Sequence, residues 1–438
     1  MKAAVIGAGL AGVEAAWQLQ KRGIPVDLYE MKPQKRSPAH RADGFAELVC
    51  SNSLKAERVN SAAGLLKAEM AAFSSVCVEA AYRTRVPAGG ALAVDRERFS
   101  AYITEKIENC AGITVIHKEV TALPADADAV IVAAGPLASD ALAETIRKLT
   151  GEAGLSFYDA AAPIVTAESI DFSEAFTQSR YDRGGADDYI NCPMNKAQYE
   201  AFYEAITTAE RAETHSFDER RDVYEGCMPI EALASRGRDT MRYGPLKPVG
   251  LVDPKTGHRP WANLQLRKEN NAGTMYNLVG FQTNLKFGEQ KRVFSMIPAL
   301  KNAQFVRYGV MHRNTFLDSP RLLSADFSLK SDPHIFFAGQ ITGVEGYMES
   351  ASSGILAGIN AARRISGKET LVLPETTMMG ALSRYISDES VQNFQPMGAN
   401  FGVLPPVGVR IRDKAARYQA LADRALSALR AEKEKMGL

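Results

Sequence analysis

The distribution of hydrophobic positions near the start of the chain predicts a strand, a helix and a second strand in close succession. Lys2–Ile6 is a short apolar run that leads directly into the glycine-rich turn Gly7-Ala8-Gly9-Leu10-Ala11-Gly12. A helical pattern follows over Val13–Arg22, and a second apolar run over Pro25–Tyr29 ends at Glu30. This succession is typical of the first βαβ unit of a parallel sheet.

The spacing of the glycines indicates a binding function for this unit. Gly7 allows a tight turn, Gly9 lets the backbone approach a pyrophosphate, and Gly12 lets the helix pack closely on the strand. The phosphates are expected at the helix N-terminus, where backbone N–H groups have no partner within the helix. Glu30 follows Gly12 by 18 positions, close to the separation of about 20 at which a carboxylate binds ribose hydroxyls. The unit therefore predicts dinucleotide binding, and the alternative is a glycine-rich turn of another α/β protein.

Two later strand patterns favour FAD as the dinucleotide. Asp128–Pro136 is a continuous apolar run that closes on Gly135, and His334–Gln340 is another that ends at Gly339 and Gln340. A helix is predicted to follow the second run. Flavoproteins that bind a dinucleotide use such a late strand-glycine-helix unit to bring a helix N-terminus to the flavin. We therefore predict an α/β fold with a Rossmann-like FAD-binding domain.

The order of these segments predicts that the FAD-binding domain is discontinuous in sequence. The sheet begins at residue 1, pauses after about residue 165 and resumes near residue 325. We assign residues 1–165 and 325–438 to the FAD-binding domain, and residues 166–324 to one inserted α+β domain. Apolar residues at helical spacing predict a final helix over Val409–Lys435 that packs on the FAD-binding domain.

The overall composition is that of a soluble globular enzyme. Of the 438 residues, 46% are hydrophobic and 24% are charged, and 52 Lys and Arg stand against 51 Asp and Glu. The sequence has no apolar run of about 18 residues and no signal peptide. We therefore expect a cytoplasmic protein that has no membrane segment.

The near-neutral average conceals two oppositely charged stretches. Residues 186–231 carry four bases and eleven acids, whereas residues 234–322 carry fifteen bases and five acids. Because basic side chains neutralise phosphates, the second stretch is a candidate RNA surface. The alternative is an ordinary solvated face, with the acidic and basic stretches paired against each other. The candidate phosphate contacts are Lys286, Lys291, Arg292, Arg307 and Arg313.

The five cysteines are widely spaced, with no two closer than 27 positions. The absence of a CxxC pair argues against a zinc site, and we predict no metal. Cys50 and Cys227 lie beside small or turn residues, whereas Cys77 and Cys110 are predicted to be packing positions. Because an unpaired cysteine is usually a small buried hydrophobe, a chemical role for Cys50 and Cys227 does not follow from their surroundings alone.

Five motifs spread over the chain point to one family. They are Gly7–Ala16, Glu47–Ser53, Glu225–Glu231, Val279–Lys286 and Ala338–Tyr347. In these motifs the chain resembles the FAD- and folate-dependent tRNA (uracil-5-)-methyltransferases, the TrmFO family, over essentially its whole length. The last motif is shared with larger relatives that modify the tRNA wobble uridine, the MnmG family, which have an additional C-terminal helical domain.

The resemblance implies a reaction and its partners. The reaction is methylation at C5 of a uridine in the T-loop of tRNA. The resemblance implies 5,10-methylenetetrahydrofolate as the one-carbon donor, FAD as the cofactor, and NADH or NADPH as the reductant of FAD. The expected partners are tRNA and folate, and we expect no stable protein partner. With folate as a partner, contact to its glutamate is a further alternative for the five basic candidates.

The resemblance also implies roles for individual residues. Cys227 is expected to add to uracil C6 as a thiolate, and Cys50 to be the base that takes the proton from C5. These two roles can be exchanged in the scheme, and in a further alternative Cys50 protects the flavin intermediate and does not touch uracil. Gln340 and Tyr347 are implied to lie near the flavin.

Three other functions fit parts of the sequence. An MnmG-like wobble-uridine modifier needs a partner GTPase and a C-terminal tRNA-binding domain, which we do not find. A plain NAD(P)H-dependent flavoprotein reductase explains the strand and glycine patterns, but neither the basic stretch nor the two cysteine motifs. A non-catalytic RNA-binding protein stabilised by FAD is the third alternative.

Overall fold

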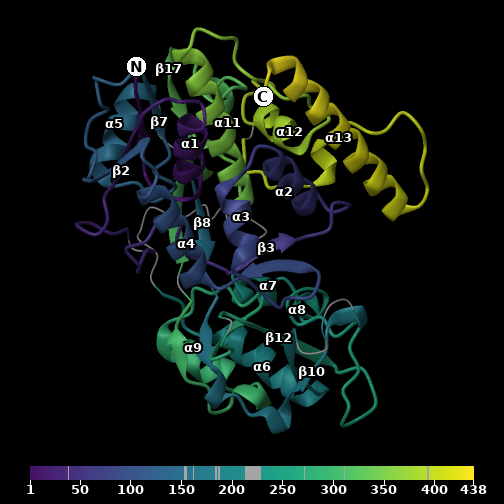
Figure 1. Ribbon diagram of the computed structural model, residues 1–438. Helices are drawn as coiled ribbons and strands as arrows, with labels where there is room; N and C mark the ends of the chain where they lie inside the picture. The colour runs from purple at the N-terminus through teal and green to yellow at the C-terminus, as the bar shows by residue number, and fades with distance from the viewer. Residues whose placement is uncertain are drawn as a thin grey trace.

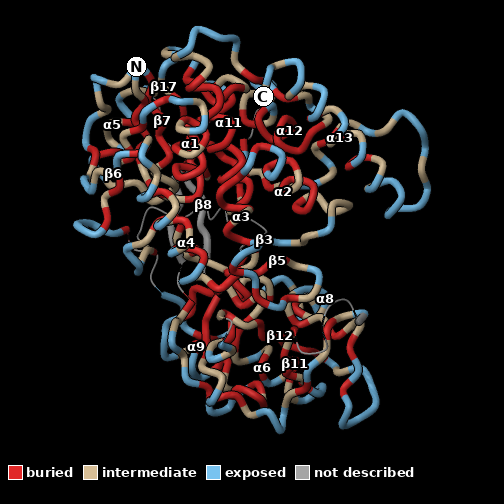
Figure 2. Tube along the Cα trace, viewed as in Figure 1, coloured by how far each residue is buried: buried red, intermediate tan, exposed pale blue. Residues whose placement is uncertain are grey.

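The chain forms two bodies, each with its own six-stranded sheet and its own hydrophobic core (Figure 1). The computed structural model describes residues 1–37, 39–151, 155–160, 162–182, 185, 188–212, 228–270, 272–309, 311–391 and 394–438. Of residues 155–160, 182 and 311–315 it describes only the backbone. Both termini lie in the upper body of Figure 1, and buried positions concentrate in the interior of each body (Figure 2).

The sheet of the upper body is the predicted dinucleotide-binding sheet. Its strand order is β16-β17-β7-β1-β2-β6, and all pairs are parallel except that between β16 and β17. The strands are β1 (Ala3–Ile6), β2 (Val26–Glu30), β6 (Ile113–His117), β7 (Ala129–Val132), β16 (Ser328–Leu329) and β17 (Asp332–Phe337). The four strands that the apolar runs predict are confirmed, although β7 and β17 end several residues earlier, before Gly135 and Gly339.

Helices cover this sheet and complete its core. α1 (Leu10–Gln20) begins inside the glycine-rich motif, three residues before the predicted start, and lies against α11 (Tyr347–Ile365). The last helix, α13 (Lys414–Met436), packs on this body as predicted through Leu421, Ala422, Ala425 and Leu429. The predicted start of α13 at Val409 is wrong, because Asp413 caps the helix by accepting a hydrogen bond from the backbone N–H of Ala416 at 2.7 Å. The remaining helices of this body are α2 (Ala62–Ala72), α3 (Val76–Arg83), α4 (Arg96–Glu108), α5 (Asp140–Thr150) and α12 (Met378–Tyr385).

A small antiparallel sheet lies between the two larger sheets in Figure 1, and its strands fall between β2 and β6 in the sequence. Its order is β3-β5-β4, with β3 (Ser53–Ala56), β4 (Arg85–Val86) and β5 (Ala91–Val94). β3 begins three residues after Cys50. This small sheet therefore places the segment that carries Cys50 where the two bodies meet.

The lower body is the inserted α+β domain. Its sheet is antiparallel in the order β10-β11-β12-β13-β9-β14, with β9 (Ile164–Thr166), β10 (Phe176–Thr177), β11 (Tyr189–Met194), β12 (Ala262–Lys268), β13 (Met275–Leu278) and β14 (Phe305–Arg307). Its helices are α6 (Lys196–Thr208), α7 (Ile230–Ser235), α8 (Thr240–Tyr243) and α9 (Phe287–Phe294).

The connection between the bodies runs through a pair of antiparallel strands, β8 (Leu155–Ala160) and β15 (Met311–Phe316), and the short helix α10 (Ser319–Leu322) follows. The boundary predicted at residue 165 falls inside β9, which pairs with strands of the lower body. We propose that the connection begins at β8, and we keep 324 as the proposed second boundary.

Candidate active site

The turn between β1 and α1 has one crowded side and one open side. Gly7 adopts a positive φ of 99°, and a Cβ added to Gly12 lies only 1.7 Å from the carbonyl oxygen of Gly7. The helix therefore packs on the turn at a distance that only glycine permits. A Cβ added to Gly9, in contrast, meets no atom of the described chain within 4 Å. The open side is the space that a pyrophosphate needs in order to reach the N-terminus of α1.

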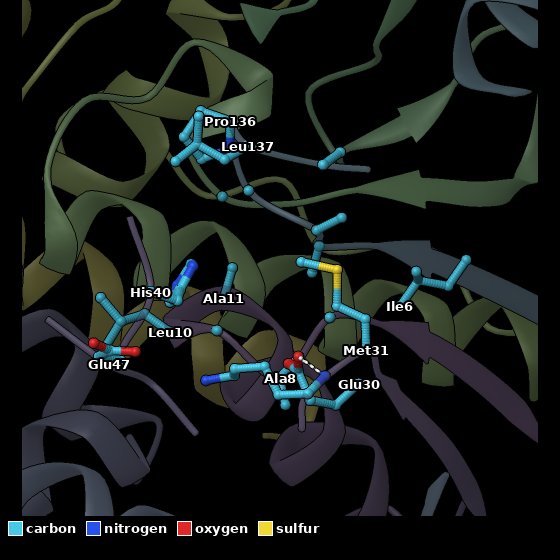
Figure 3. Close-up of a pocket in the computed structure, with 18 of the residues that line it drawn as sticks. Ile6, Ala8, Leu10, Ala11, Glu30, Met31, His40, Glu47, Pro136 and Leu137 are labelled. Carbon is cyan, nitrogen blue, oxygen red and sulfur yellow. Dashed lines mark hydrogen bonds between the residues drawn. The ribbon is translucent and has the colours of Figure 1, made fainter. Parts of the chain in front are cut away.

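Glu30, at the end of β2, lies beside this turn. Its carboxylate accepts hydrogen bonds from the backbone N–H groups of Ala8 at 2.9 Å and Lys32 at 3.0 Å. Figure 3 shows the carboxylate next to Ala8, with a hydrogen bond drawn. Only 7% of Glu30 is exposed. The two hydrogen bonds fix the orientation of the carboxylate at the position where the motif expects ribose hydroxyls.

The turn and Glu30 line a cavity that is partly open to solvent, and the space between its lining residues, including the open part, is about 1360 Å³. Every residue that the sequence predicts for cofactor binding lines it except Gly12, which lies behind the turn. These residues are Gly7, Ala8, Gly9, Leu10, Ala11, Glu30, Gly135, Gly339, Gln340 and Tyr347. The cavity thus combines a phosphate-cradling turn, a fixed carboxylate and the N-terminal end of α11. This donor set fits FAD.

The residues after β17 are themselves fixed by hydrogen bonds. The backbone N–H of Gly339 donates to Oγ of Ser353 at 2.7 Å, and Nε2 of Gln340 donates to Oε2 of Glu345 at 2.6 Å. Glu345 belongs to the segment that leads into α11, and Ser353 lies within that helix. The wall of the cavity around Gly339 is therefore tied to α11.

The thiol loop, residues 48–52, brings Cys50 to the wall of the same cavity. The hydroxyl oxygen of Tyr347, the first residue of α11, accepts hydrogen bonds from the backbone N–H of Cys50 at 2.7 Å and of Ser51 at 3.1 Å. Burial, together with the nearby Cys50, raises the pKa of Tyr347 well above its usual value. The phenol therefore stays protonated at neutral pH while its oxygen holds the loop.

Two guanidinium groups hold the carbonyl side of the thiol loop. Arg96 donates to the carbonyl oxygens of Leu48 and Cys50, the second at 3.1 Å. Arg307 donates to the carbonyl oxygen of Val49. Three successive carbonyl groups of the loop are thus bonded to positive charges, which leaves its backbone little freedom.

The inserted domain completes the support of the loop. Glu269, 3% exposed at its side chain, pairs with Arg96 through oxygens 2.6 and 3.3 Å from the guanidinium nitrogens. Arg267, at the end of β12, donates to Oδ1 of Asn52 and Oγ of Ser51, both at 2.9 Å. The position of Cys50 therefore depends on residues more than 200 positions away in the sequence.

The charges around the loop favour an anionic group beside Arg96. Burial opposes the charged form of Arg96, but Glu269, Tyr347 and Cys50 together raise its pKa above the usual value. Burial and the neighbouring Arg96 charge lower the pKa of Arg307. Nearby cationic side chains favour the thiolate form of a cysteine. The arrangement thus suits a reactive cysteine better than a packing one.

Cys227, the other predicted catalytic cysteine, lies outside the described residues, which resume at Met228. Four positions further along the chain, the buried carboxylate of Glu231 accepts hydrogen bonds from Oγ1 of Thr283 at 2.9 Å and from the backbone N–H of Asn284 at 2.7 Å. Burial raises the pKa of Glu231. These bonds join two motifs, Glu225–Glu231 and Val279–Lys286, that are about 50 residues apart in sequence.

Comparisons with known proteins agree with these motifs. Residues 2–369 match the family model described as glucose inhibited division protein A. The chain is 59% identical to the methylenetetrahydrofolate--tRNA-(uracil-5-)-methyltransferase TrmFO of Acetivibrio thermocellus, with 97% of each chain covered. It is 56% identical to the enzyme of the same name from Listeria monocytogenes, with 99% of each chain covered. The chain belongs to the TrmFO family.

The fold of this TrmFO family member is shared with a solved structure of lower identity. GidA of Aquifex aeolicus superposes with a TM-score of 0.71 at 18% identity, over 98% of this chain and 73% of that one. The family resemblance and the α/β, Rossmann-like fold with an inserted α+β domain are thus confirmed.

Two of the predicted RNA contacts of this TrmFO family member pair with acids. Nζ of Lys286 lies 2.8 Å from a carboxylate oxygen of Glu210, and Nη2 of Arg292 lies 2.6 Å from one of Glu289. Glu210 belongs to the acidic stretch and Lys286 to the basic one. Part of the charge of the two stretches is therefore neutralised by ion pairing between them. Exposed pairs of this kind contribute about 0–1 kcal/mol and can be broken by a competing phosphate.

The other three RNA candidates differ among themselves. Lys291 is exposed on α9, and in the described part of the chain no ion pair involves it. Arg307 is half-buried and bonded to the thiol loop, so it is directed toward the cavity wall. The side chain of Arg313, on β15, lies outside the described residues. The structure therefore leaves Lys291 as the RNA candidate with the most accessible charge.

Arg96, Arg267 and Glu269, which help to position Cys50, were not found by sequence reasoning. Arg267 and Glu269 could have been noticed, because they follow the apolar residues Ala262, Leu264 and Leu266 of a strand, and a charged residue at the end of such a strand needs a partner if it is buried. Arg96 has no such signal, since it opens a surface helix after Asp95. Its role in holding the thiol loop can be recognised only in the folded structure, where the two bodies meet.

The remaining cysteines do not contribute to the cavity. Cys77 and Cys192 are fully buried, and burial raises the pKa of each thiol, as expected of packing positions. Cys110 is half-buried just after α4. The described residues contain no group of three or more His, Cys, Asp or Glu side chains suited to a metal ion. Among the helices that the structure describes, none combines the length and apolarity needed to cross a bilayer.

Proposed function

We propose that this chain transfers the one-carbon unit of 5,10-methylenetetrahydrofolate to C5 of a uridine in the T-loop of tRNA. The observation that carries the proposal is 56–59% identity, over nearly the full length of both chains, to relatives named for methylenetetrahydrofolate, tRNA and uracil-5 methylation. The cavity supports it, because a dinucleotide-binding turn and Cys50 line the same space.

The cavity residues bind and orient the cofactor in this proposal. A one-carbon unit at the methylene level is one hydride short of a methyl group, and bound FAD, reduced by NADH or NADPH, supplies that hydride. The turn Gly7–Ala11 binds the pyrophosphate, and Glu30 binds ribose hydroxyls. Gly135, Gly339, Gln340 and Tyr347 flank the rest of the cofactor.

The cysteines activate the uracil. Uracil C5 is a weak nucleophile until a thiolate adds to C6 and the C5–C6 electron pair moves toward the C4 carbonyl, which forms an enolate. We assign this thiolate to Cys227 on the family resemblance. After C5 has bonded to the one-carbon unit, a base removes the C5 proton and the bond between that unit and its carrier breaks, which leaves an exocyclic methylene group on C5. A hydride added to this methylene would complete the methyl group, and the thiolate leaves C6 as the C5–C6 double bond is restored. We assign the base to Cys50.

The surroundings of Cys50 support this assignment. A base must be deprotonated before the reaction, and Arg96 and Arg307 place positive charge beside the thiol. Hydrogen bonds from both sides of the backbone hold the thiol loop in one place. A cysteine that must remove one particular proton, the one on uracil C5, benefits from such fixed positioning.

The proposal is tested by supplying labelled methylenetetrahydrofolate, NADPH and unmodified tRNA to the purified protein. We expect label in 5-methyluridine of the T-arm. Label at the wobble position indicates the MnmG-like function, and NADPH oxidation without label indicates a plain reductase. Either result contradicts the proposal.

The two cysteine roles are separated by trapping the covalent adduct. If Cys227 is the nucleophile and Cys50 the base, Cys50→Ala accumulates a protein–tRNA adduct that survives denaturing electrophoresis, and Cys227→Ala forms none. The reverse pattern shows that the roles are exchanged. If Cys50 only protects the cofactor, Cys50→Ala still releases tritium from tRNA labelled at uridine C5.

We further propose a cytoplasmic location, transient binding of NAD(P)H and no stable protein partner. Lys286, Lys291, Arg292 and Arg313 stay proposed RNA contacts. For Arg307 we propose positioning of the thiol loop, because its guanidinium is bonded to Val49.

A further inference from the structure

The projecting loop before α13, together with the first residues of that helix, has an unusual concentration of positive charge. We call residues 405–418 the basic arm. It carries Arg410, Arg412, Lys414 and Arg417, all exposed, and one acid, Asp413. In Figure 1 it is part of the yellow loop that stands out from the upper body at the right, and Figure 2 shows it largely exposed.

The basic arm is held in place without Arg410 and Arg412. Arg424, farther along α13, donates to the carbonyl oxygens of Pro405 and Pro406, the second at 2.9 Å. At the other end, the rings of Phe401 and Tyr418 lie 4.4 Å apart. Two consecutive prolines restrict the backbone further. The arm is therefore an anchored structure whose fold does not require its charges.

The charges of the arm have no acidic partners in the part of the chain that the structure describes. The carboxylate of Asp413 is engaged in capping α13. Lys414 and Arg417 lie 5.5 and 5.6 Å from the ring centre of Tyr418, and no ion pair is found for either of them, for Arg410 or for Arg412. Such clustered like charges repel one another, so they do not stabilise the folded chain.

The arm thus differs from the stretch that the charge count favours. Lys286 and Arg292 in the inserted domain are paired with Glu210 and Glu289, whereas the arm offers its charges directly to solvent. None of residues 405–418 lines the cavity. A ligand attracted by these positive charges is therefore an anion that binds outside the cavity and carries several negative charges along its length.

We propose that the basic arm binds the phosphate backbone of tRNA at a place remote from the reacting uridine. The inference rests on the proposed function, because that function makes tRNA the substrate, and tRNA is a polyanion that extends beyond any cavity of this size. Alternating basic residues at 410, 412 and 414 offer several contacts to successive phosphates. Contacts of this kind position the RNA and add affinity but do not read its sequence.

The test is the salt dependence of tRNA binding by Arg410→Glu/Arg412→Glu, in the full-length holoprotein and without folate. We expect Kd to rise at least about tenfold at low salt, and the slope of log Kd against log salt to fall by about one for each lost phosphate contact. Bound FAD and its reduction by NADPH stay unchanged, which shows that the variant is folded. Arg410→Lys/Arg412→Lys keeps the charge and is expected to bind nearly as the parent chain does.

The matched control is Lys21→Glu/Lys368→Glu, which makes the same change in net charge at two exposed lysines outside the arm, the cavity and the basic stretch 234–322. We expect little change in tRNA affinity. An equal loss in this control, or unchanged Kd and slope in the arm variant, overturns the proposal. If the arm variant loses binding to polyglutamate but still binds tRNA, the arm is a protein-binding surface, and the proposal is overturned as well. Because binding is measured without folate, a parent chain that binds tRNA but transfers no label contradicts the proposed function and leaves the arm intact.

Discussion

The glycine-rich turn and the thiol loop line one cavity but are built in opposite ways. The turn is formed by six consecutive residues, and its shape follows from which of them lack a Cβ. The thiol loop is held by Arg96, Arg267, Arg307 and Tyr347, which come from distant parts of the chain. A turn with room for a pyrophosphate is thus shaped by consecutive residues, whereas the position of Cys50 requires the assembled protein.

The largest effect is expected where the turn is most crowded. In Gly12→Ala the new Cβ collides with the carbonyl of Gly7, so we expect a loss of more than about 4 kcal/mol in the free energy of unfolding and no bound FAD. In Gly9→Ala the methyl group meets no protein atom, so the melting temperature of the FAD-free protein stays near that of the parent while FAD content falls. Thermal unfolding and flavin absorbance measure both. A stable, yellow Gly12→Ala protein contradicts this account of the turn.

The next effect concerns the support of the thiol loop. Arg96→Met leaves Glu269 buried without its partner, which costs about 3–5 kcal/mol of stability. In Arg96→Met/Glu269→Leu we expect much of the stability to return, because no unpaired charge remains. Methyl transfer stays low in both variants, because the carbonyls of Leu48 and Cys50 have lost their donor. Urea unfolding and label transfer measure the two quantities, and recovery of activity in the double variant contradicts a positioning role.

A smaller effect is expected from the hydroxyl of Tyr347. Tyr347→Phe leaves the backbone N–H groups of Cys50 and Ser51 without an acceptor, which costs about 1–3 kcal/mol. We expect FAD to stay bound and kcat for methyl transfer to fall. Tyr385→Phe is the control, since that hydroxyl bonds to the carbonyl of Gln395, outside the cavity. Equal kcat in the two variants argues that the loop needs no anchor at α11.

The smallest effect, taken per pH unit and per group, is a dependence of stability on pH that originates in α1 and α2, outside both regions. Burial raises the pKa of Glu14, in α1, and of Glu69, in α2, to about 7 in each case. Because the ordinary value is 4.5, the folded protein binds more protons than the unfolded chain between pH 4.5 and 7. The free energy of unfolding therefore falls as pH rises through this window, by at most about 1.4 kcal/mol per pH unit for each group.

This dependence is measured by urea unfolding at several pH values between 5 and 8. Glu14→Gln keeps a hydrogen-bonding side chain beside Ser75 and Cys77 but cannot titrate. We expect a shallower decline of stability in this variant than in the parent chain. An unchanged slope shows that Glu14 does not supply the proton uptake.

Local patterns were sufficient for most of the upper body. Short apolar runs predict the four strands around the turn, and the glycine spacing predicts the cavity residues from Gly7 to Ala11. The errors lie at the ends of helices and strands, where a contact of a single side chain can set the boundary. Asp413 moves the start of α13 by capping it, a contact that hydrophobic spacing does not reveal.

The sequence by itself determined the dinucleotide motif, the discontinuous domain and the family, because each depends on residues that are close together or on motifs that can be compared directly. Only the tertiary structure decided which charges are available. In the folded chain Lys286 is paired with Glu210, Arg307 is hydrogen-bonded to the thiol loop, and Arg410 and Arg412 are exposed. The physical reason is that a charge count along the chain adds residues regardless of their partners, whereas binding depends on which partners folding brings within a few ångströms.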